Sequence, residues 1–396
     1  DKAQTLQTVF TVLTEAVAKG EQCYVYATCS DTQLDILENL PFPVNNGAPL
    51  KGNIQWRYSP TREGIEKAIL QEIENYDAVL GINLFNPIWQ SIYNPTPPTT
   101  HKGLSSLFGM IRAMNQQDKG DKHGPSVNSW PKIFGMEHSW NEIYNSGNGN
   151  NTKKSSLFCN TKVSRQMLHH LGATSEQLES QGSPWLQLCD LFGRHVAKEN
   201  LVTLLFPHNS WLEQVPGLKD YVDELVVTTN RLCHEKGWQF IAKTRSKYNT
   251  SLDLSAFDEV VTDDNAFDHL NLYSKSRIAL HFCSSAVCEL AFTKTCSVTA
   301  LPSQNMGIHS RNRRLQRAKR IIHEQYYNPV SFLDSSPFAT FVEDRSDIYN
   351  TISNLMEQSS EDLNWEEFQE RYFPSEKPHR SAGQNVFKRM MELLAN

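Results

Sequence analysis

Residues 201–206 (LVTLLF) form an uninterrupted apolar run, which is typical of a parallel β-strand covered on both of its faces. Residues 221–235 follow it with apolar side chains at helical spacing. The face of this helix that should turn inward holds Val222, Leu225, Val226 and Leu232. Further strands are expected at 238–242, 259–262 and 277–282. Strands separated by helices require right-handed crossovers, so this half of the chain predicts an α/β fold with a doubly wound parallel sheet.

The first half of the chain repeats this alternation. Ser59-Pro60-Thr61 opens a helix whose apolar positions continue to Ile73. Strands are expected on either side of it, at 22–27, 54–58, 77–84 and 132–136, with a short one at 157–160. Two such blocks in tandem predict two Rossmann-like doubly wound domains that face each other across a cleft.

The length of 396 residues suits two domains of about 150–200 residues each. We place an N-terminal domain at 1–190 and a C-terminal domain at 200–375, separated by the polar stretch between them. Residues 376–396 end in an amphipathic helix, which can pack back on the first domain. Its apolar face holds Val386, Phe387, Met390 and Leu394.

Composition excludes several classes of protein. The net charge of −6 gives no general attraction to nucleic acid or to an anionic membrane. No stretch reaches the ~18 apolar residues of a membrane span, and the N-terminal residues do not resemble a signal peptide. The eight cysteines include no C-x-x-C pair, so we expect buried free thiols and a cytoplasmic protein. The sequons at Asn150 and Asn249 weigh slightly against that compartment.

Residues 281–292 (HFCSSAVCELAF) carry the most informative chemistry. A strand ends at Phe282, Ser284 and Ser285 follow, and a helix begins near Ala286. The carboxyl end of a parallel strand followed by a helix N-terminus is a common place for a phosphate group. Glu289 lies one turn into that helix, where a carboxylate can accept hydrogen bonds from a ribose diol. The alternative is an ordinary strand-to-helix connection capped by serine.

The order of several segments resembles the GT-B glycosyltransferases and their relatives, the non-hydrolysing UDP-N-acetylglucosamine epimerase and the CDP-glycerol glycerophosphotransferases. The resemblance extends from about residue 157 to residue 301 and includes the C-terminal tail. Its segments are Gly182-Ser183-Pro184, the loop 207–210 after the apolar strand, the strand and basic loop 239–247, and the Ser-Ser-Glu stretch within 273–290. The resemblance implies a glycosyltransferase that moves a sugar from a nucleotide donor to a glycan or glycoconjugate acceptor.

The resemblance also assigns roles to individual residues. It places Ser284, Ser285 and Glu289 at the donor nucleotide. It places Lys243 and Arg245 at the diphosphate leaving group, although a solvated basic loop is the alternative. The remaining donor-binding candidates are His208, Asn209 and Asp264. A UDP-sugar is slightly favoured over a GDP-sugar, and we expect neither a metal nor another cofactor.

The first domain should supply the acceptor site and a general base. A base must be a carboxylate or an imidazole near the carboxyl end of a strand. Glu137 and His138, directly after the strand 132–136, fit this requirement best. Asp31 competes with them, although it is better suited to cap a helix. All three are therefore candidate catalytic residues.

Three hypotheses on function remain open, and sugar transfer is the first of them. For transfer, Ser297 stands where retaining enzymes of this kind often have a second carboxylate, which favours inversion. An epimerase or a polyol-phosphate transferase of the same fold is the second hypothesis, and a non-catalytic nucleotide- or glycan-binding module is the third. The basic stretch 311–320 is either a solvated helix face or a surface that steers an anionic substrate.

Overall fold

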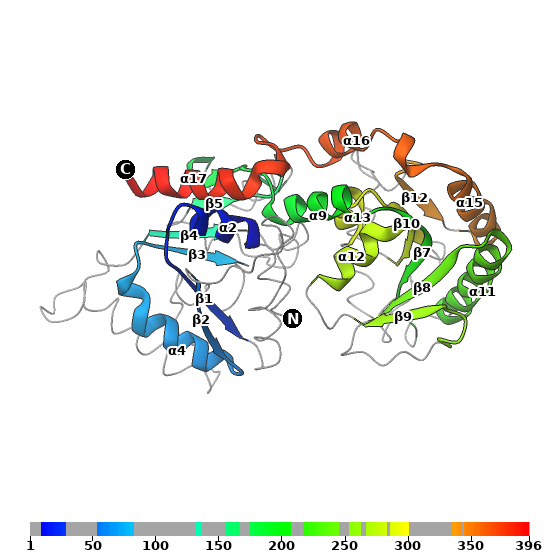
Figure 1. Cartoon of the computed structure of the whole chain (residues 1–396), viewed down its shortest axis with the longest axis horizontal. Helices are drawn as coiled ribbons and strands as arrows, with labels where there is room; N and C mark the ends of the chain where they lie inside the picture. Colours follow the sequence, from blue (N-terminus) through cyan, green and yellow to red (C-terminus); the bar gives the residue numbers. More distant parts are fainter. Residues whose placement is uncertain are drawn as a thin grey trace, which may run out of the picture. The chain divides into compact units, whose positions relative to one another are not determined.

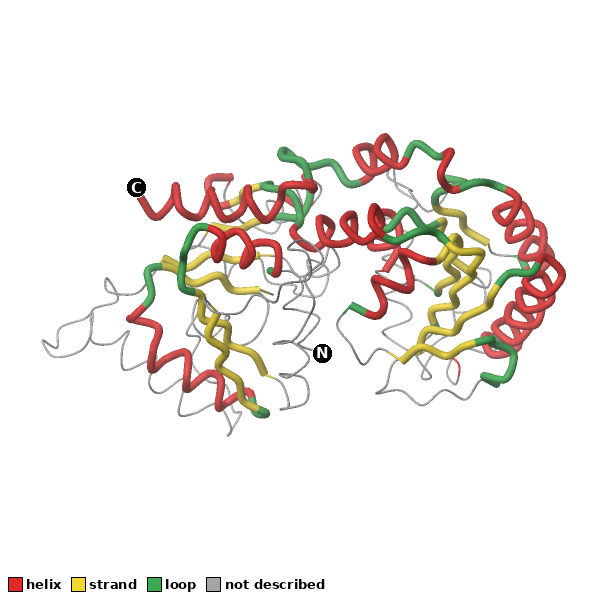
Figure 2. The backbone as a smooth tube through the Cα atoms, viewed as in Figure 1, coloured by secondary structure: helices red, strands yellow, loops and turns green. Residues whose placement is uncertain are grey.

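A computed structural model describes most, but not all, of the chain. The described residues are 9–28, 54–82, 132–136, 156–162, 164–165, 175–206, 212, 217–244, 253–262, 267–282, 286–300, 335–342 and 344–395. By its internal contacts the chain divides into two compact units (Figure 2). Unit 1 comprises residues 1–187 and 373–396, and unit 2 comprises residues 188–372. No helix within the described ranges is long and apolar enough to span a membrane.

Unit 2 is built on one six-stranded parallel sheet. Its order is β12-β11-β10-β7-β8-β9. The strands are β7 (Glu199–Leu205), β8 (Gln239–Thr244), β9 (Glu259–Thr262), β10 (Ser276–His281), β11 (Cys296–Ala300) and β12 (Ala339–Val342). The chain builds outward from β7 to one side and from β10 to the other, so the order of the strands reverses between these two. Ligands of open α/β sheets bind at such a switch point, outside the carboxyl ends of the strands.

Helices cover both faces of this sheet. On one face α11 (Leu218–Lys236) and α15 (Arg345–Glu357) pack together, and on the other lie α12 (Asp268–Lys275) and α13 (Ala286–Phe292) (Figure 1). The four apolar residues predicted to turn inward from α11 are all buried. The unit is completed by α9 (Pro184–His195), whose first residues belong to unit 1, and by α16 (Trp365–Tyr372). The doubly wound fold predicted for this half is confirmed.

Unit 1 contains two groups of parallel strands. The pair β1 (Cys23–Thr28) and β2 (Ile54–Ser59) is one. The other has the order β3-β4-β5-β6, formed by β3 (Ala78–Ile82), β4 (Lys132–Met136), β5 (Ser156–Phe158) and β6 (Leu178–Glu179). The helix expected after residue 59 is α4 (Arg62–Glu72), capped by the Thr61 hydroxyl, which accepts from Gly64 N at 3.2 Å. A short 3-10 turn, η1 (Ile73–Asn75), continues it.

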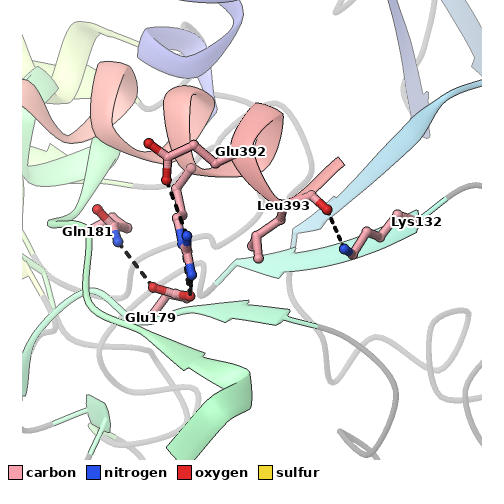
Figure 3. Close-up of polar contacts among 6 residues, drawn as sticks. Lys132, Glu179, Gln181, Glu392 and Leu393 are labelled. Carbon is pink, nitrogen blue, oxygen red and sulfur yellow. Dashed lines mark hydrogen bonds and ion pairs between the residues drawn. The ribbon is translucent and has the colours of Figure 1, made fainter. Parts of the chain in front are cut away.

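The last helix of the chain, α17 (Ala382–Ala395), packs in unit 1 against α2 (Phe10–Ala18). Ala382 and Val386 are fully buried in this contact region. Polar side chains also join α17 to two strands of unit 1 (Figure 3): Arg389 contacts Glu179 of β6, and Lys132 of β4 donates to the Leu393 carbonyl. The two ends of the described chain thus lie side by side in one unit.

The stretch between 190 and 200, where the two predicted domains are separated, contains the end of a helix and the start of a strand. Residues 184–195 form α9, and β7 begins at Glu199. The polar residues that suggested a linker are partly satisfied within the helix, because Arg194 Nε lies 2.9 Å from Asp190 Oδ2. A charged pair at this spacing supports a helix instead of ending it.

The described cysteines agree with the expectation of buried free thiols. Among the described cysteines, the buried free thiols are Cys159, Cys189, Cys233, Cys288 and Cys296, whereas Cys23 is half-buried.

Candidate functional site

The carboxyl edge of the six-stranded sheet carries a row of polar side chains. Lys243 of β8 is paired with Leu205 of β7. His281 lies one residue beyond Leu280, which pairs with Leu204 of β7, and His281 is itself paired with Thr299 of β11. Residues aligned across parallel strands place their side chains on the same face. Lys243, His281 and Thr299 therefore face the same side, close to the switch point.

Lys243 lies inside a strand, not on a loop. The strand was expected to end at residue 242, but β8 continues to Thr244 because it is paired on both sides, with β7 and with β9. The Lys243 residue is 8% exposed. A buried ammonium group in a low-dielectric setting attracts an anion more strongly than one in water does. The solvated basic loop, which was the alternative for this residue, is wrong for Lys243.

His281 is a further candidate site residue, which the sequence reasoning did not select. Its Nε2 lies 3.3 Å from the Thr299 hydroxyl, and the residue is 1% exposed. Burial lowers the pKa of His281 to about 4, so the imidazole is neutral at physiological pH. The available signal was its position at the end of the predicted strand, directly before the two serines. Its neutral ring is suited to hydrogen bonding and not to charge neutralisation.

Glu289 lies on α13, after the end of β10. Its side chain is 19% exposed, and its Oε2 is 3.9 Å from Nε2 of the buried His269 on α12. The thiols of Cys189 and Cys288 are also close. Burial raises the pKa of both thiols well above its usual value, and the negative charge of Glu289 raises it further. The Glu289 carboxylate thus has two neutral thiols and a histidine near it, and its side chain is partly exposed.

Most of the predicted site residues lie outside the described residues. These are Asp31, Glu137, His138, His208, Asn209, Arg245, Asp264, Ser284 and Ser285. Glu137 and His138 directly follow β4 in the chain. Of the predicted donor-binding residues the structure therefore places Lys243 and Glu289, both in unit 2. Within the described part of the chain, no group of three or more His, Cys, Asp or Glu residues could hold a metal ion. Metal independence stays a prediction.

Comparison with known proteins gives a likeness in structure only. No protein-family model matches the chain, and no curated protein matches it in sequence. Solved structures match nearly all of it. The UDP-GlcNAc 2-epimerase of Methanocaldococcus jannaschii has a TM-score of 0.55 at 11% identity, covering 98% of this chain and 96% of its own. The UDP-N-acetylglucosamine 2-epimerase of Rickettsia bellii has a TM-score of 0.53 at 14% identity, with 98% and 93% covered.

A third structure, S. aureus MnaA solved together with UDP, has a TM-score of 0.52 at 12% identity and covers 99% of this chain and 94% of its own. Identities this low establish the fold and nothing beyond it. The chain has the GT-B fold, with two Rossmann-like parallel-sheet units, as the resemblance in sequence predicted.

Proposed function

We propose that this chain is an enzyme that acts on a nucleotide-diphosphate sugar, with a UDP-sugar as the first expectation. The proposal depends mainly on the carboxyl edge of the six-stranded sheet, close to the switch point. Lys243 lies there on β8, and Glu289 lies on α13, which follows β10. A cation and a carboxylate are the two groups needed there, one for a diphosphate and one for a ribose diol. The S. aureus structure solved with UDP, similar over nearly the whole chain, supports this nucleotide.

The proposed reaction is transfer of the sugar to a hydroxyl of a glycan or glycoconjugate. The acceptor oxygen attacks the anomeric carbon, its proton passes to a base, and the bond to the diphosphate oxygen breaks. Its electron pair leaves with the diphosphate. Glu137, His138 and Asp31 are the candidates for the base. Lys243, together with Arg245, stabilises the leaving charge in place of a metal. The single displacement by the acceptor oxygen inverts the anomeric centre.

A second candidate reaction is epimerisation of the sugar at C2. It is favoured by one specific observation: solved structures with similar fold over 93% or more of their own length are 2-epimerases of UDP-N-acetylglucosamine. Inversion at C2 must break the C2–H bond, and the replacing proton comes from solvent. That requirement distinguishes epimerisation from transfer.

A donor panel in D₂O tests both reactions. The protein is incubated with UDP-N-acetylglucosamine, UDP-glucose and GDP-mannose, with and without glycan acceptors, and followed by NMR. Release of UDP or GDP that depends on an acceptor supports transfer. A 2-epimer carrying deuterium at C2 supports epimerisation, and nucleotide binding without turnover supports the non-catalytic module. Failure to bind any of these donors would overturn the proposal.

Lys243→Met tests the role of the cation. Methionine keeps the length of the side chain and suits a buried site, so folding should be preserved. A cation aimed at the leaving diphosphate acts mainly on the transition state, so we expect kcat to fall by roughly 10²–10³-fold, with a smaller change in KM. The matched control is Lys388→Met, on an exposed part of α17. Unchanged kcat with a lowered Tm would identify Lys243 as a structural residue.

A further inference from the structure

The chain passes between the two units twice, from residue 187 to residue 188 and back from residue 372 to residue 373. We call residues 180–187, which precede the first passage, the outgoing segment, and residues 373–385, which follow the second, the returning segment. Both segments belong to unit 1. The outgoing segment contains Gly182-Ser183-Pro184, one of the motifs on which the resemblance in sequence rests, and the proposed function assigns it no role.

The backbones of the two segments are in close contact at Gly182. Its φ is +85°, in the left-handed region that favours glycine. A Cβ at this position would lie 3.1 Å from the Pro378 carbonyl oxygen and 3.3 Å from the His379 Cα. A polar contact joins the segments further along, where Gly383 N donates to Gln187 Oε1 at 2.8 Å. A glycine at residue 182 thus lets the returning segment approach the residue before Ser183.

The imidazole ring of His379, in the returning segment, connects the two segments. Its Nε2 lies 2.8 Å from the carbonyl oxygen of Phe373, where the chain has just returned to unit 1. Its Nδ1 accepts from the amide of Ser183, directly before α9, at 2.9 Å. Because Nδ1 accepts, it carries no proton, and Nε2 is the N–H that donates to the Phe373 carbonyl. Only the neutral ring, in this one tautomer, makes both bonds.

The Ser183 amide depends on this bond. Ser183 is 1% exposed, so water does not readily replace a lost partner, and an unpaired buried amide is costly. Its hydroxyl is already used within α9, where it accepts from Leu186 N at 3.3 Å. The contact between His379 and Ser183 is therefore a point at which a change in one ring alters how the start of α9 is held.

We propose that His379 is a pH-sensitive latch: its neutral ring holds the outgoing and returning segments together, and protonation of Nδ1 releases the outgoing segment. An imidazolium ring carries a proton on both nitrogens, so its Nδ1–H would point at the Ser183 N–H and the bond is lost. The bond to Phe373 survives, because Nε2 is a donor in both forms. The latch thus opens on one side only, at the start of α9.

The other charged groups near the latch do not repeat this property. The outgoing segment has no charged side chain. Histidine is the side chain whose charge ordinarily changes between pH 8 and pH 5. Among the described residues, the charged side chains on elements that contact the two segments are Glu15 of α2, Lys162 and Arg165 after β5, Glu179 of β6, the Asp190–Arg194 pair of α9, Lys388, Arg389 and Glu392 of α17, and, in the returning segment itself, Glu376, which pairs with Arg165, Lys377 and Arg380.

Nitrogen NMR of the histidine rings in the full chain, with the His379 signals assigned by their absence in His379→Asn, tests the latch. At pH 8 the His379 ring should be the Nε2–H tautomer. As the pH is lowered, hydrogen exchange in residues 181–187, corrected for its intrinsic pH dependence, should speed up by about fivefold or more. This change should occur at the pH at which the ring becomes charged. An Nδ1–H tautomer at pH 8, a ring still neutral at pH 5, or a charged ring with unchanged exchange would each overturn the inference.

Two variants without a titrating ring separate the two bonds. His379→Asn keeps an acceptor near the position of Nδ1, so residues 181–187 should stay protected at pH 8 and at pH 5. His379→Gln keeps a donor near the position of Nε2 but loses that acceptor, so exchange should be fast at both. The control is His234→Asn, at an exposed position of α11, which should keep the wild-type pH dependence. The same pH dependence in wild type and His379→Asn would overturn the inference, and this comparison decides if His379→Gln fails to fold.

Discussion

The two units fix their helices in different ways. In unit 2 the helix pair α12–α13 is tied at its base by Lys198, whose Nζ lies within hydrogen-bonding distance of three oxygen atoms. In unit 1 the polar contacts of α17 are near solvent, with the Arg389 side chain 33% exposed. Such contacts contribute little, whereas the bonds of the half-buried Lys198 are less screened by water and more costly to disturb. We infer that α17 is held by packing and the base of α12–α13 by hydrogen bonds.

Gly383→Ala gives the largest expected effect, because it disturbs the packing of α17. A Cβ at Gly383 would lie 2.6 Å from the carbonyl carbon and oxygen of Thr11 on α2, so backbone must move. Overpacking of this kind costs about 1–3 kcal/mol, which exceeds the ~1 kcal/mol that alanine gains over glycine in a helix. Hydrogen exchange should speed up in α2 and α17 and stay unchanged in α12 and α13.

The control is Gln384→Ala, at the exposed neighbouring position of α17. It should leave exchange in α2 unchanged. A stabilised Gly383→Ala protein would contradict the claim that close backbone packing holds α17.

The tie at Lys198 should instead be sensitive to pH. Burial lowers the pKa of Lys198 to about 7, with the charges of Lys294 and Arg277 adding to this and the Cys296 thiol opposing it. Between pH 7 and the higher pKa of the unfolded chain, the unfolded state binds more protons, so stability rises with pH. From pH 7 to pH 9 this group should add about 2 kcal/mol to the stability of unit 2.

Lys198→Met removes the titrating group, so its protein should lack that increase. Urea unfolding at pH 7 and pH 9, with hydrogen exchange of α12 and β11 as the local readout, measures the difference. The matched control is Lys275→Met, whose 40% exposed side chain is paired with Glu199. An equal pH dependence in wild type and Lys198→Met would mean that Lys198 keeps an ordinary pKa in the folded chain.

The sequence predicted the elements that depend on local patterns and missed those that depend on contacts between distant residues. The strands at 132–136 and 259–262 were placed correctly to the residue, because their apolar residues are local signals. The extent of β8 was missed, because its last residues are strand only through their pairing with β7 and β9. The role of Lys198 was also missed, since its acceptors lie 75 to 97 residues further along the chain.

The residues of the candidate site also differ in how far the sequence could identify them. Glu289 and Lys243 could be selected because each lies next to a recognisable strand and helix boundary. His269 carries no such signal: it is the second residue of α12, and only the packing of α12 on α13 brings it to Glu289. Contacts across helices depend on tertiary structure, which periodicity does not encode.

Arg389→Ala gives the smallest expected effect and tests the other side of the comparison. Its Nε and Nη2 donate to Glu179 Oε1 at 3.0 and 2.8 Å, which is a well-formed pair, but water screens it. Its loss should cost about 0.5–1 kcal/mol, and most of that cost should disappear in high salt.

Arg389→Lys keeps the charge but loses the planar guanidinium geometry. The free energy of unfolding of this variant should therefore lie between those of wild type and Arg389→Ala. Lys219→Ala, which breaks the more exposed Lys219–Asp223 pair of α11, gives the lower limit. A loss from Arg389→Ala larger than that from Gly383→Ala, and unaffected by salt, would mean that the ion pair and not the packing holds α17.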